Sequence, residues 1–316
     1  MTVKVGVIGA GRWGKNHLRV YSELECNLAG LADINPDCKK LADEFGVKFY
    51  SDYKQMLGKV DAVSVVVPTD LHFEVVKTCL EAGKHVFVEK PITMNSGETE
   101  ELVELAKHKG LVLMAGYLFR FNAATLKLKE LLENAGDIHY ITARYVHSTK
   151  PPRKDSGVIF NFGVHLIDIL SFILERPPES VFCKKHNYLS EDREDSALIL
   201  LDYGNLIANL EVGWFHPLKK RDMWIIASKE KVYVDFLEQM IVRYPIRVTY
   251  DEVSAEKEVI EEFPKNEPLK EELKYFVECV RDGRKPEVDS EEYMTTRICE
   301  LCLKSAKVGA EIPVSD

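Results

Sequence analysis

The sequence predicts an α/β protein of two domains: a doubly wound parallel sheet over residues 1–121, then an α+β domain with an open, mostly antiparallel sheet over residues 122–316. Three observations predict this architecture. The chain has 316 residues, about twice the length of an ordinary domain. Up to about residue 120, short apolar runs alternate with amphipathic stretches, as in repeated strand–helix units. Beyond Asn122, long stretches alternate apolar and polar residues with a period of two.

The first domain is predicted from runs that suit buried parallel strands and from apolar residues at helical spacing between those runs. Strands are expected at Val3 to Ile8, Leu28 to Ala32, Ala62 to Val67, His85 to Val88 and Leu111 to Ala115. Helices are expected at Trp13 to Leu24, Pro36 to Phe45, Leu71 to Ala82 and Gly97 to Lys109.

The second domain is predicted to be strand-rich, with alternation over Leu206 to Trp214 and Val232 to Phe236. Helices are expected at Ala123 to Asn134, Phe162 to Leu174 and Leu269 to Val280, the last two covering one face of the sheet. The other face has no obvious cover. This predicts a homodimer or homotetramer that associates through the sheet, with covering loops as the alternative.

Composition narrows the class of protein. With 46% hydrophobic and 29% charged residues the chain is typical of globular proteins, and a net charge of -9 without a basic patch argues against a nucleic-acid partner. No apolar run approaches the ~18 residues of a membrane span. The chain enters a strand at once, without a leader-like segment. Seven scattered cysteines favour a reducing compartment, so we expect a cytoplasmic protein. The Cys299-x-x-Cys302 pair is interpreted as helix packing, and no metal is expected.

The segment Gly9-Ala10-Gly11-Arg12-Trp13-Gly14 follows a strand and opens a helix. That context makes the G-x-G-x-x-G pattern a dinucleotide-binding fingerprint of the Rossmann type. The first glycine permits the tight turn, the second lets the backbone approach a pyrophosphate, and the third allows close helix–strand packing. Cofactor contacts are therefore predicted at Gly9, Gly11, Arg12, Trp13 and Gly14.

Asp33 ends the second expected strand, at about the 20-residue offset where a carboxylate accepts hydrogen bonds from the adenosine ribose. A carboxylate at this place repels the extra phosphate of NADP, and no arginine follows within the next few residues. The cofactor is therefore predicted to be NAD. In the alternative interpretation Asp33 caps the helix at Pro36, which leaves the choice of cofactor open.

Glu89-Lys90-Pro91 follows the strand at His85 to Val88, at the carboxyl end where open α/β sheets bind ligands. A lysine there can hold a substrate hydroxyl near a nicotinamide and stabilise the alkoxide that forms as hydride leaves. Taken alone, a lysine at a strand end is more often a solvated charge.

The fingerprint, the Glu-Lys-Pro tripeptide and the segment from Gly157 to Asp168 occur in this order across both domains. In this combination the sequence resembles the Gfo/Idh/MocA oxidoreductase family. The resemblance implies a Rossmann domain, an open-sheet α/β domain, and reversible hydride transfer at a carbinol carbon of a sugar or cyclitol.

The resemblance also implies roles for individual residues. Lys90 matches the lysine beside the reacting hydroxyl, and His165 matches the histidine that removes or returns its proton. Without the resemblance, His165 is better interpreted as a helix histidine buried against the sheet. Many relatives have an aspartate four residues before this histidine, whereas this chain has Asn161. Since an amide cannot take a proton, this departure weakens an assignment to the inositol dehydrogenases.

Two further loops resemble family motifs. Pro68-Thr69-Asp70-Leu71-His72 resembles the loop under the nicotinamide ribose, and Arg120-Phe121 resembles a signature at the domain junction. His72 suits a cofactor contact and a structural hydrogen bond equally well, while packing at the junction is slightly favoured for Arg120. Pro68, Thr69, His72, Glu89 and Lys90 complete the predicted cofactor contacts.

The Gly-Val-Ile run before Asn161, the acidic Asp33 and the compact length resemble the subgroup that acts on nucleotide-linked sugars. The hypothesis is oxidation of the C3 hydroxyl of UDP-N-acetylglucosamine, bound by Lys90, Asn161 and His165. Lys150, Arg153 and Lys154 would suit its diphosphate, and an exposed loop is at least as good an interpretation of them. The alternatives are a free-sugar or inositol dehydrogenase, a keto-sugar reductase, and a non-catalytic dinucleotide-binding regulator.

Overall fold

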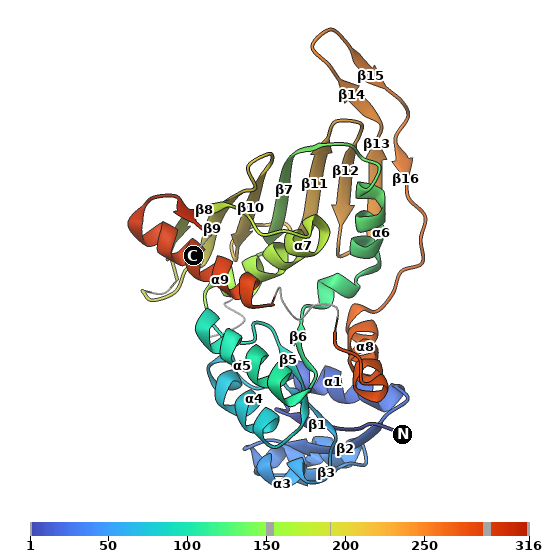
Figure 1. Cartoon of the computed structure of the whole chain (residues 1–316), viewed down its shortest axis with the longest axis vertical. Coiled ribbons are helices and arrows are strands. Elements are labelled where there is room, and N and C mark those ends of the chain that lie inside the picture. Colours follow the sequence, from blue (N-terminus) through green and yellow to red (C-terminus); the bar gives the residue numbers. More distant parts are fainter. Residues whose placement is uncertain (1, 150–154, 190, 287–291, 315–316) are drawn as a thin grey trace. The chain divides into compact units, whose positions relative to one another are not determined.

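The computed structural model describes residues 2–149, 155–189, 191–286 and 292–314 (Figure 1). The chain divides into two compact units. The first comprises Met1–Leu118 and Leu269–Thr296, and the second comprises Phe119–Pro268 and Arg297–Asp316. No helix among the described residues is both long and apolar enough to cross a bilayer.

The first unit contains a six-stranded parallel sheet in the order β3-β2-β1-β4-β5-β6. Its strands are β1 (Lys4–Ile8), β2 (Asn27–Ala32), β3 (Lys48–Tyr50), β4 (Ala62–Val65), β5 (His85–Glu89) and β6 (Leu113–Gly116). The five predicted strands are confirmed, and β3 was not predicted. The order reverses between β1 and β4, which is the place where doubly wound sheets bind their ligands.

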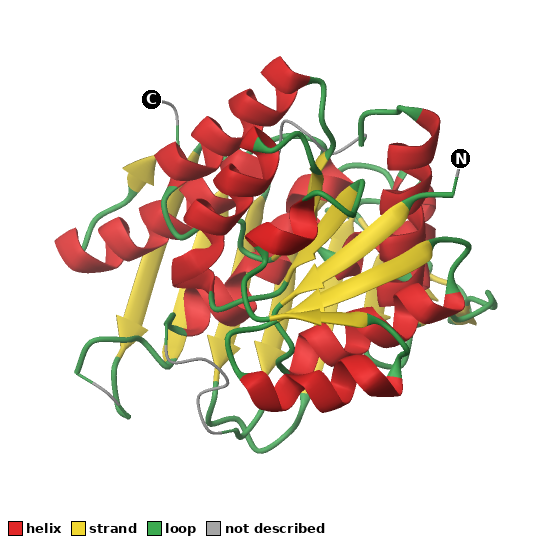
Figure 2. Cartoon of the chain, turned by 90° about the horizontal axis from the view of Figure 1, so that it is seen from below, coloured by secondary structure: helices red, strands yellow, loops and turns green. Residues whose placement is uncertain are grey.

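Helices lie on both sides of this sheet (Figure 2). They are α1 (Arg12–Glu23), η1 (Pro36–Cys38), α2 (Lys39–Glu44), α3 (Lys54–Leu57), η2 (Thr69–Leu71), α4 (His72–Glu81) and α5 (Ser96–Lys109). Local chemistry sets the ends of α5. The side chain of Asn95 accepts a hydrogen bond from the Glu98 amide at 3.0 Å, and Gly110 ends the helix with φ of 66°.

Helix α8 (Pro268–Asp282) corrects a prediction, because it packs in the first unit instead of covering the second sheet. Phe276 meets Phe87 of β5 edge to face at 5.7 Å, and Lys270 forms an ion pair with Glu23 of α1. Its apolar stripe predicted an amphipathic helix but carried no information about which sheet it would cover.

The second unit contains a nine-stranded sheet in the order β16-β13-β12-β11-β7-β10-β9-β8-β17. The strands are β7 (Ile138–Val146), β8 (Ser180–His186), β9 (Ser196–Asp202), β10 (Ile207–Gly213), β11 (Lys220–Ala227), β12 (Lys231–Asp235), β13 (Met240–Tyr244), β16 (Val259–Ile260) and β17 (Ile312–Pro313). Only the β7–β10 pair is parallel, so the predicted mostly antiparallel sheet is confirmed. Strands β14 (Ile246–Val248) and β15 (Val253–Ala255) form a separate hairpin.

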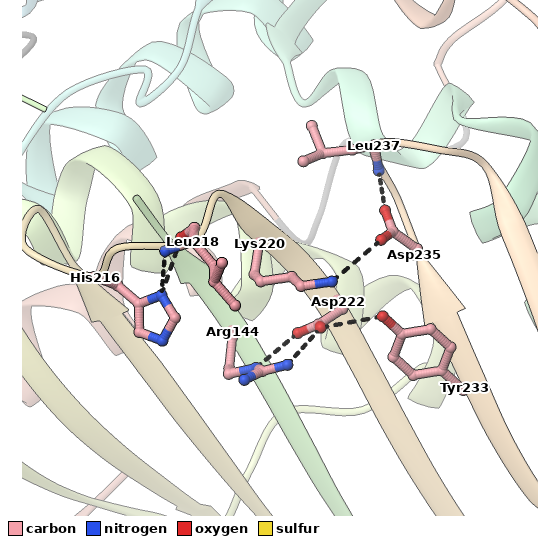
Figure 3. Close-up of polar contacts among 8 residues, drawn as sticks. All are labelled: Arg144, His216, Leu218, Lys220, Asp222, Tyr233, Asp235 and Leu237. Atoms are coloured by element: carbon pink, nitrogen blue, oxygen red, sulfur yellow. Dashed lines mark hydrogen bonds and ion pairs between the residues drawn. The ribbon is translucent and has the colours of Figure 1, made fainter. Parts of the chain in front are cut away.

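The two faces of this sheet differ. Three helices cover the inner face: α6 (Ala123–Leu132), α7 (Val164–Leu174) and α9 (Glu292–Val308) (Figure 1). Along β7 the side chains alternate, so Ile141, Ala143 and Tyr145 are buried beneath these helices. On the outer face, Arg144 forms a bidentate ion pair with Asp222, which also accepts a hydrogen bond from the Tyr233 hydroxyl (Figure 3).

Candidate active site

The glycine-rich turn between β1 and α1 has the geometry of a pyrophosphate cradle. Gly9 has φ of 102°, and a Cβ there would lie 2.5 Å from the Val66 carbonyl oxygen. A Cβ on Gly14 would collide with the Gly9 carbonyl. By contrast, a Cβ on Gly11 would meet open space. Gly9 and Gly14 therefore hold strand and helix close together, while Gly11 leaves room for a ligand.

A cavity of about 660 Å³ opens at this turn. Helix α1 begins here with Gly11 as its N-cap and without a side-chain cap, so its first amides are available to an anion. The turn, the ends of β2 and β4 and the loop after β3 line the cavity, with side chains that include Asp33, Ile34, Asp52, Tyr53, Pro68 and Leu71. A dinucleotide fits this donor set.

Asp33 lies in the cavity wall and braces the glycine-rich turn. Its Oδ2 accepts a hydrogen bond from the Ala10 amide at 2.7 Å, and its Oδ1 accepts one from the Asn35 amide at 2.8 Å. The helical turn at Pro36 is capped by Asn35 instead of Asp33. Asp52 is a second carboxylate in the same wall, and this residue was not predicted. Two acids beside the cavity disfavour a further phosphate on the ribose.

Lys90 is 7% exposed and follows the end of β5, joined to Pro91 by a cis peptide bond. The Glu89 carboxylate accepts a hydrogen bond from the Lys90 backbone amide and lies 3.1 Å from His17 Nε2. His17 Nδ1 lies 2.8 Å from the Ser64 hydroxyl, which also accepts a hydrogen bond from the Tyr21 hydroxyl. This buried polar chain holds the backbone of Lys90 against α1 and β4, and its members His17, Ser64 and Tyr21 were not predicted.

In the loop after β4, some residues line the cavity and others are buried in the core. Pro68 is exposed and lines the cavity, whereas Thr69 and His72 are buried. His72 Nδ1 lies 2.9 Å from the Pro91 carbonyl oxygen and Nε2 lies 3.0 Å from that of Val67. This is the structural arrangement that the sequence left open as an alternative, and it links the loop to the segment after Lys90. Arg12 and Trp13 lie on the first turn of α1 and are exposed.

In the second unit, Asn161 lies in a π-helical turn, η4 (Ile159–Gly163), that leads into α7. His165 follows on the first turn of α7, and both side chains are 5% exposed. The His165 ring stacks on Tyr145 at 5.6 Å and meets Phe119 edge to face at 5.1 Å. Single π-helical turns are frequent at functional sites.

Helix α7 is anchored by a buried ion pair that the sequence did not predict. Arg120 Nε and Nη2 both donate to Asp168 Oδ1, at 2.8 and 2.6 Å, and both side chains are nearly fully buried. Asp168 comes three residues after His165, so the pair fixes the rotation of the helix that presents the histidine. Both residues belong to the second unit, so the packing of Arg120 at the domain junction stays a prediction.

Glu194 holds the start of the π-helical turn and was also not predicted. Its carboxylate accepts a hydrogen bond from the Ile159 amide at 3.0 Å and lies against Gly157, where a Cβ would collide with it. Burial raises the pKa of Glu194. No local pattern reveals this contact, because the partners are far apart in the sequence. Lys150, Arg153 and Lys154 lie outside the described residues.

Two family models match the chain. Residues 3–117 match "Oxidoreductase family, NAD-binding Rossmann fold", and residues 125–233 match the GFO/IDH/MocA C-terminal domain. Together the two models cover more than half of the chain, one in each unit.

Characterised relatives and solved structures agree with these matches. The chain is 29% identical to UDP-N-acetylglucosamine 3-dehydrogenase of Acidithiobacillus ferrooxidans over 77% of each chain. It is 26% identical to myo-inositol 2-dehydrogenase of Thermotoga maritima over 92% of each. A crystal structure of the Acidithiobacillus enzyme superposes with a TM-score of 0.86 at 25% identity, covering 98% of this chain and 99% of that one.

Proposed function

Because this chain belongs to the Gfo/Idh/MocA oxidoreductase family, we propose that it is a nucleotide-sugar dehydrogenase that oxidises the C3 hydroxyl of UDP-N-acetylglucosamine. The family places it among the NAD-dependent oxidoreductases that act on CH–OH groups, with a small-molecule substrate. The substrate proposal rests on the similarity to the Acidithiobacillus 3-dehydrogenase, together with Asn161 at the position where inositol dehydrogenases are expected to carry a carboxylate.

The proposed roles follow from the chemistry of each side chain. Lys90 binds the reacting hydroxyl and stabilises the developing alkoxide, and His165 takes the proton. Asn161 orients the sugar or the imidazole, since an amide can donate and accept hydrogen bonds without changing charge. NAD, held by Gly9, Gly11, Gly14, Asp33 and Pro68, supplies the hydride acceptor. Glu89, Thr69 and His72 position the loops that carry these contacts.

We assign the cofactor to residues 1–121, and the sugar and subunit association to residues 122–316. The outer face of the second sheet supports the association, because Tyr140, Leu198, Leu200 and Ile207 are all exposed there. The proposed location is the cytoplasm. Its reducing conditions suit a chain in which the seven cysteines form no disulfide among the described residues.

An inositol or another free polyol is the second candidate substrate, favoured by the match to the Thermotoga enzyme along 92% of the chain. The deciding experiment measures NADH formation from NAD with UDP-N-acetylglucosamine, N-acetylglucosamine, glucose and myo-inositol. A clear preference in kcat/KM for the nucleotide sugar is expected. A preference for a free polyol would overturn the substrate proposal, and absence of turnover with every carbinol would favour a regulator.

Lys90→Met tests the chemical role within the same assay. We expect turnover to fall by about a hundredfold or more while NADH binding is retained, because the ammonium group acts on the reacting oxygen. Lys107→Met removes an exposed lysine from the same unit and serves as the matched control. Equal turnover in the two variants would exclude a catalytic role for Lys90.

A further inference from the structure

A platform of aromatic rings extends from His165 over the inner face of the second sheet. Tyr145 and Phe162 stack in parallel at 4.2 Å with an interplanar angle of 10°. His147 stacks on Phe162 at 5.1 Å, and Trp214 meets Phe162 edge to face at 6.3 Å. The platform is continuous with the stacked pair of Tyr145 and His165.

Polar atoms with unused hydrogen-bonding capacity surround this platform. Trp214 Nε1, Arg221 Nε and His147 Nδ1 are buried, and none has a hydrogen-bond partner within the described part of the chain. The guanidinium group of Arg221 lies 4.4 Å from the centre of the Tyr145 ring. Tryptophan and arginine nitrogens can only donate, so a group that satisfies them must offer acceptor oxygens. Buried donors without acceptors are costly, so acceptor oxygens placed here would be favoured.

The charge around the platform is positive. Strand alternation directs Lys220 and Asp222 to the outer face, where they pair with Asp235 and Arg144 (Figure 3). Arg221 points to the inner face, and no carboxylate of the described residues forms an ion pair with it. Burial lowers the pKa of His147, and the nearby charges of Arg221 and Lys219 lower it further.

We propose that Arg221, Trp214 and His147 form a binding site for an oxyanion of the sugar substrate, a phosphate ester or a carboxylate, on the platform beside His165. The proposal rests on the proposed function in that it takes this part of the second unit as the sugar site. An arginine Nε–H and an indole N–H match the acceptor oxygens of such a group, and the rings support the apolar face of the sugar. The substrate is therefore an anionic sugar derivative and not a neutral polyol.

Calorimetric titration of the full chain, saturated with NADH, tests the proposal. The anionic probes are UDP, inorganic pyrophosphate and glucuronate, which separate a diphosphate source from a carboxylate source. The neutral probes are N-acetylglucosamine and myo-inositol. Arg221→Gln should weaken the tightest anionic probe by about tenfold or more, since it removes a charged hydrogen bond. Binding of NADH should be unchanged, and Arg221→Lys should restore part of the affinity.

Arg247→Gln, on the exposed β14–β15 hairpin, removes the same charge elsewhere and is the matched control. Equal affinities in Arg221→Gln and Arg247→Gln would overturn the proposal, as would failure of every anionic probe to bind the wild type. Should Arg221→Gln fail to fold, Trp214→Phe keeps the ring, removes the donor and supports the same comparison. Loss of anion binding in a protein that does not oxidise UDP-N-acetylglucosamine would uphold the oxyanion site and reject only the proposed substrate. If Arg221→Gln oxidises UDP-N-acetylglucosamine as fast as the wild type does, the proposed substrate is upheld and the oxyanion site is rejected.

Discussion

At the scale of single residues, Asp33 has two tasks that need one carboxylate in one place. It accepts a hydrogen bond from the Ala10 amide within the glycine-rich turn, and it contributes negative charge to the cavity wall, which also contains Asp52. The first task needs only an acceptor oxygen, whereas rejection of a ribose phosphate needs the charge. Replacement of Asp33 by asparagine removes the charge but keeps an acceptor oxygen, so it tests the two tasks separately.

Asp33→Asn should keep the hydrogen bond from the Ala10 amide and lose the one from the Asn35 amide, which an NH2 group cannot accept. It should also lose part of the selectivity. The ratio of NADPH to NADH dissociation constants should fall by at least about tenfold, because one of the two repelling charges is gone. Fluorescence titration with both nucleotides measures this ratio. Asp37→Asn, an exposed acid close by in the sequence, is the control. An unchanged ratio in Asp33→Asn would remove Asp33 from cofactor selection.

The residues that could be predicted from the sequence are those whose chemistry is local. Gly9, Gly11 and Gly14 are predictable because a single turn requires all three, and Lys90 is predictable because it directly follows the end of one strand. Glu194 was not predictable, because its partner amide at Ile159 is 35 residues away and nothing in either segment points to the other. The same holds for the cavity residues after β3, which only the parallel pairing of β2 and β3 brings beside Asp33.

At the scale of elements, the rotation of α7 depends on its ion pair with Arg120. Asp168→Ala leaves a buried guanidinium without its carboxylate, and the free energy of unfolding should fall by about 3–5 kcal/mol. Urea denaturation in a Trp13→Phe background measures it, because the remaining tryptophans, Trp214 and Trp224, both lie in the second unit.

Glu130→Ala, from a largely exposed ion pair on α6, is the control for this measurement and should change stability by less than about 1 kcal/mol. Similar losses for Asp168→Ala and Glu130→Ala would mean that the buried pair does not anchor α7.

Glu194 links the π-helical turn to pH. Burial raises its pKa above the ordinary 4.5, so the folded protein binds this proton more tightly than the unfolded chain does. The contribution of Glu194 to the free energy of unfolding therefore falls as the pH rises from the ordinary pKa through the raised one. Below the ordinary pKa the carboxyl group is protonated in both the folded and the unfolded state, and its titration does not affect stability. Relative to the wild type, Glu194→Gln should gain melting temperature as the pH rises through that window. Thermal melts across acidic pH measure it, and a constant offset between the two proteins would contradict the prediction.

Elements were predictable where a period of two or of 3.6 residues was long enough to recognise. Strand β3 was not predicted, because three residues are too few to show a period. The position of α8 was predicted wrongly for a different reason. Its apolar stripe could cover either sheet, and only tertiary packing, such as that of Phe276 against Phe87, places it on the first sheet.

At the scale of the whole molecule, the exposed outer face of the second sheet predicts self-association. Tyr140 and Ile207 are opposite each other on β7 and β10, and Leu198 and Leu200 continue the patch on β9. Leu200→Lys should shift the sedimentation coefficient from a dimer or tetramer to a monomer, because it places a charge within the exposed patch that the association would bury. Val248→Lys on the hairpin is the control. A wild type that sediments as a monomer would contradict the prediction.

The path of the chain has a consequence for its synthesis. The first unit is closed by α8, which emerges from the ribosome only after the whole β7–β16 region has been made. Until then the Phe87 side of the parallel sheet lacks one of the helices that pack against it, α8, although α1 is already present. A nascent polypeptide stalled near residue 121 should consequently be protease-sensitive and in need of chaperones, and the cofactor half should acquire its native resistance only when nearly the full message has been translated.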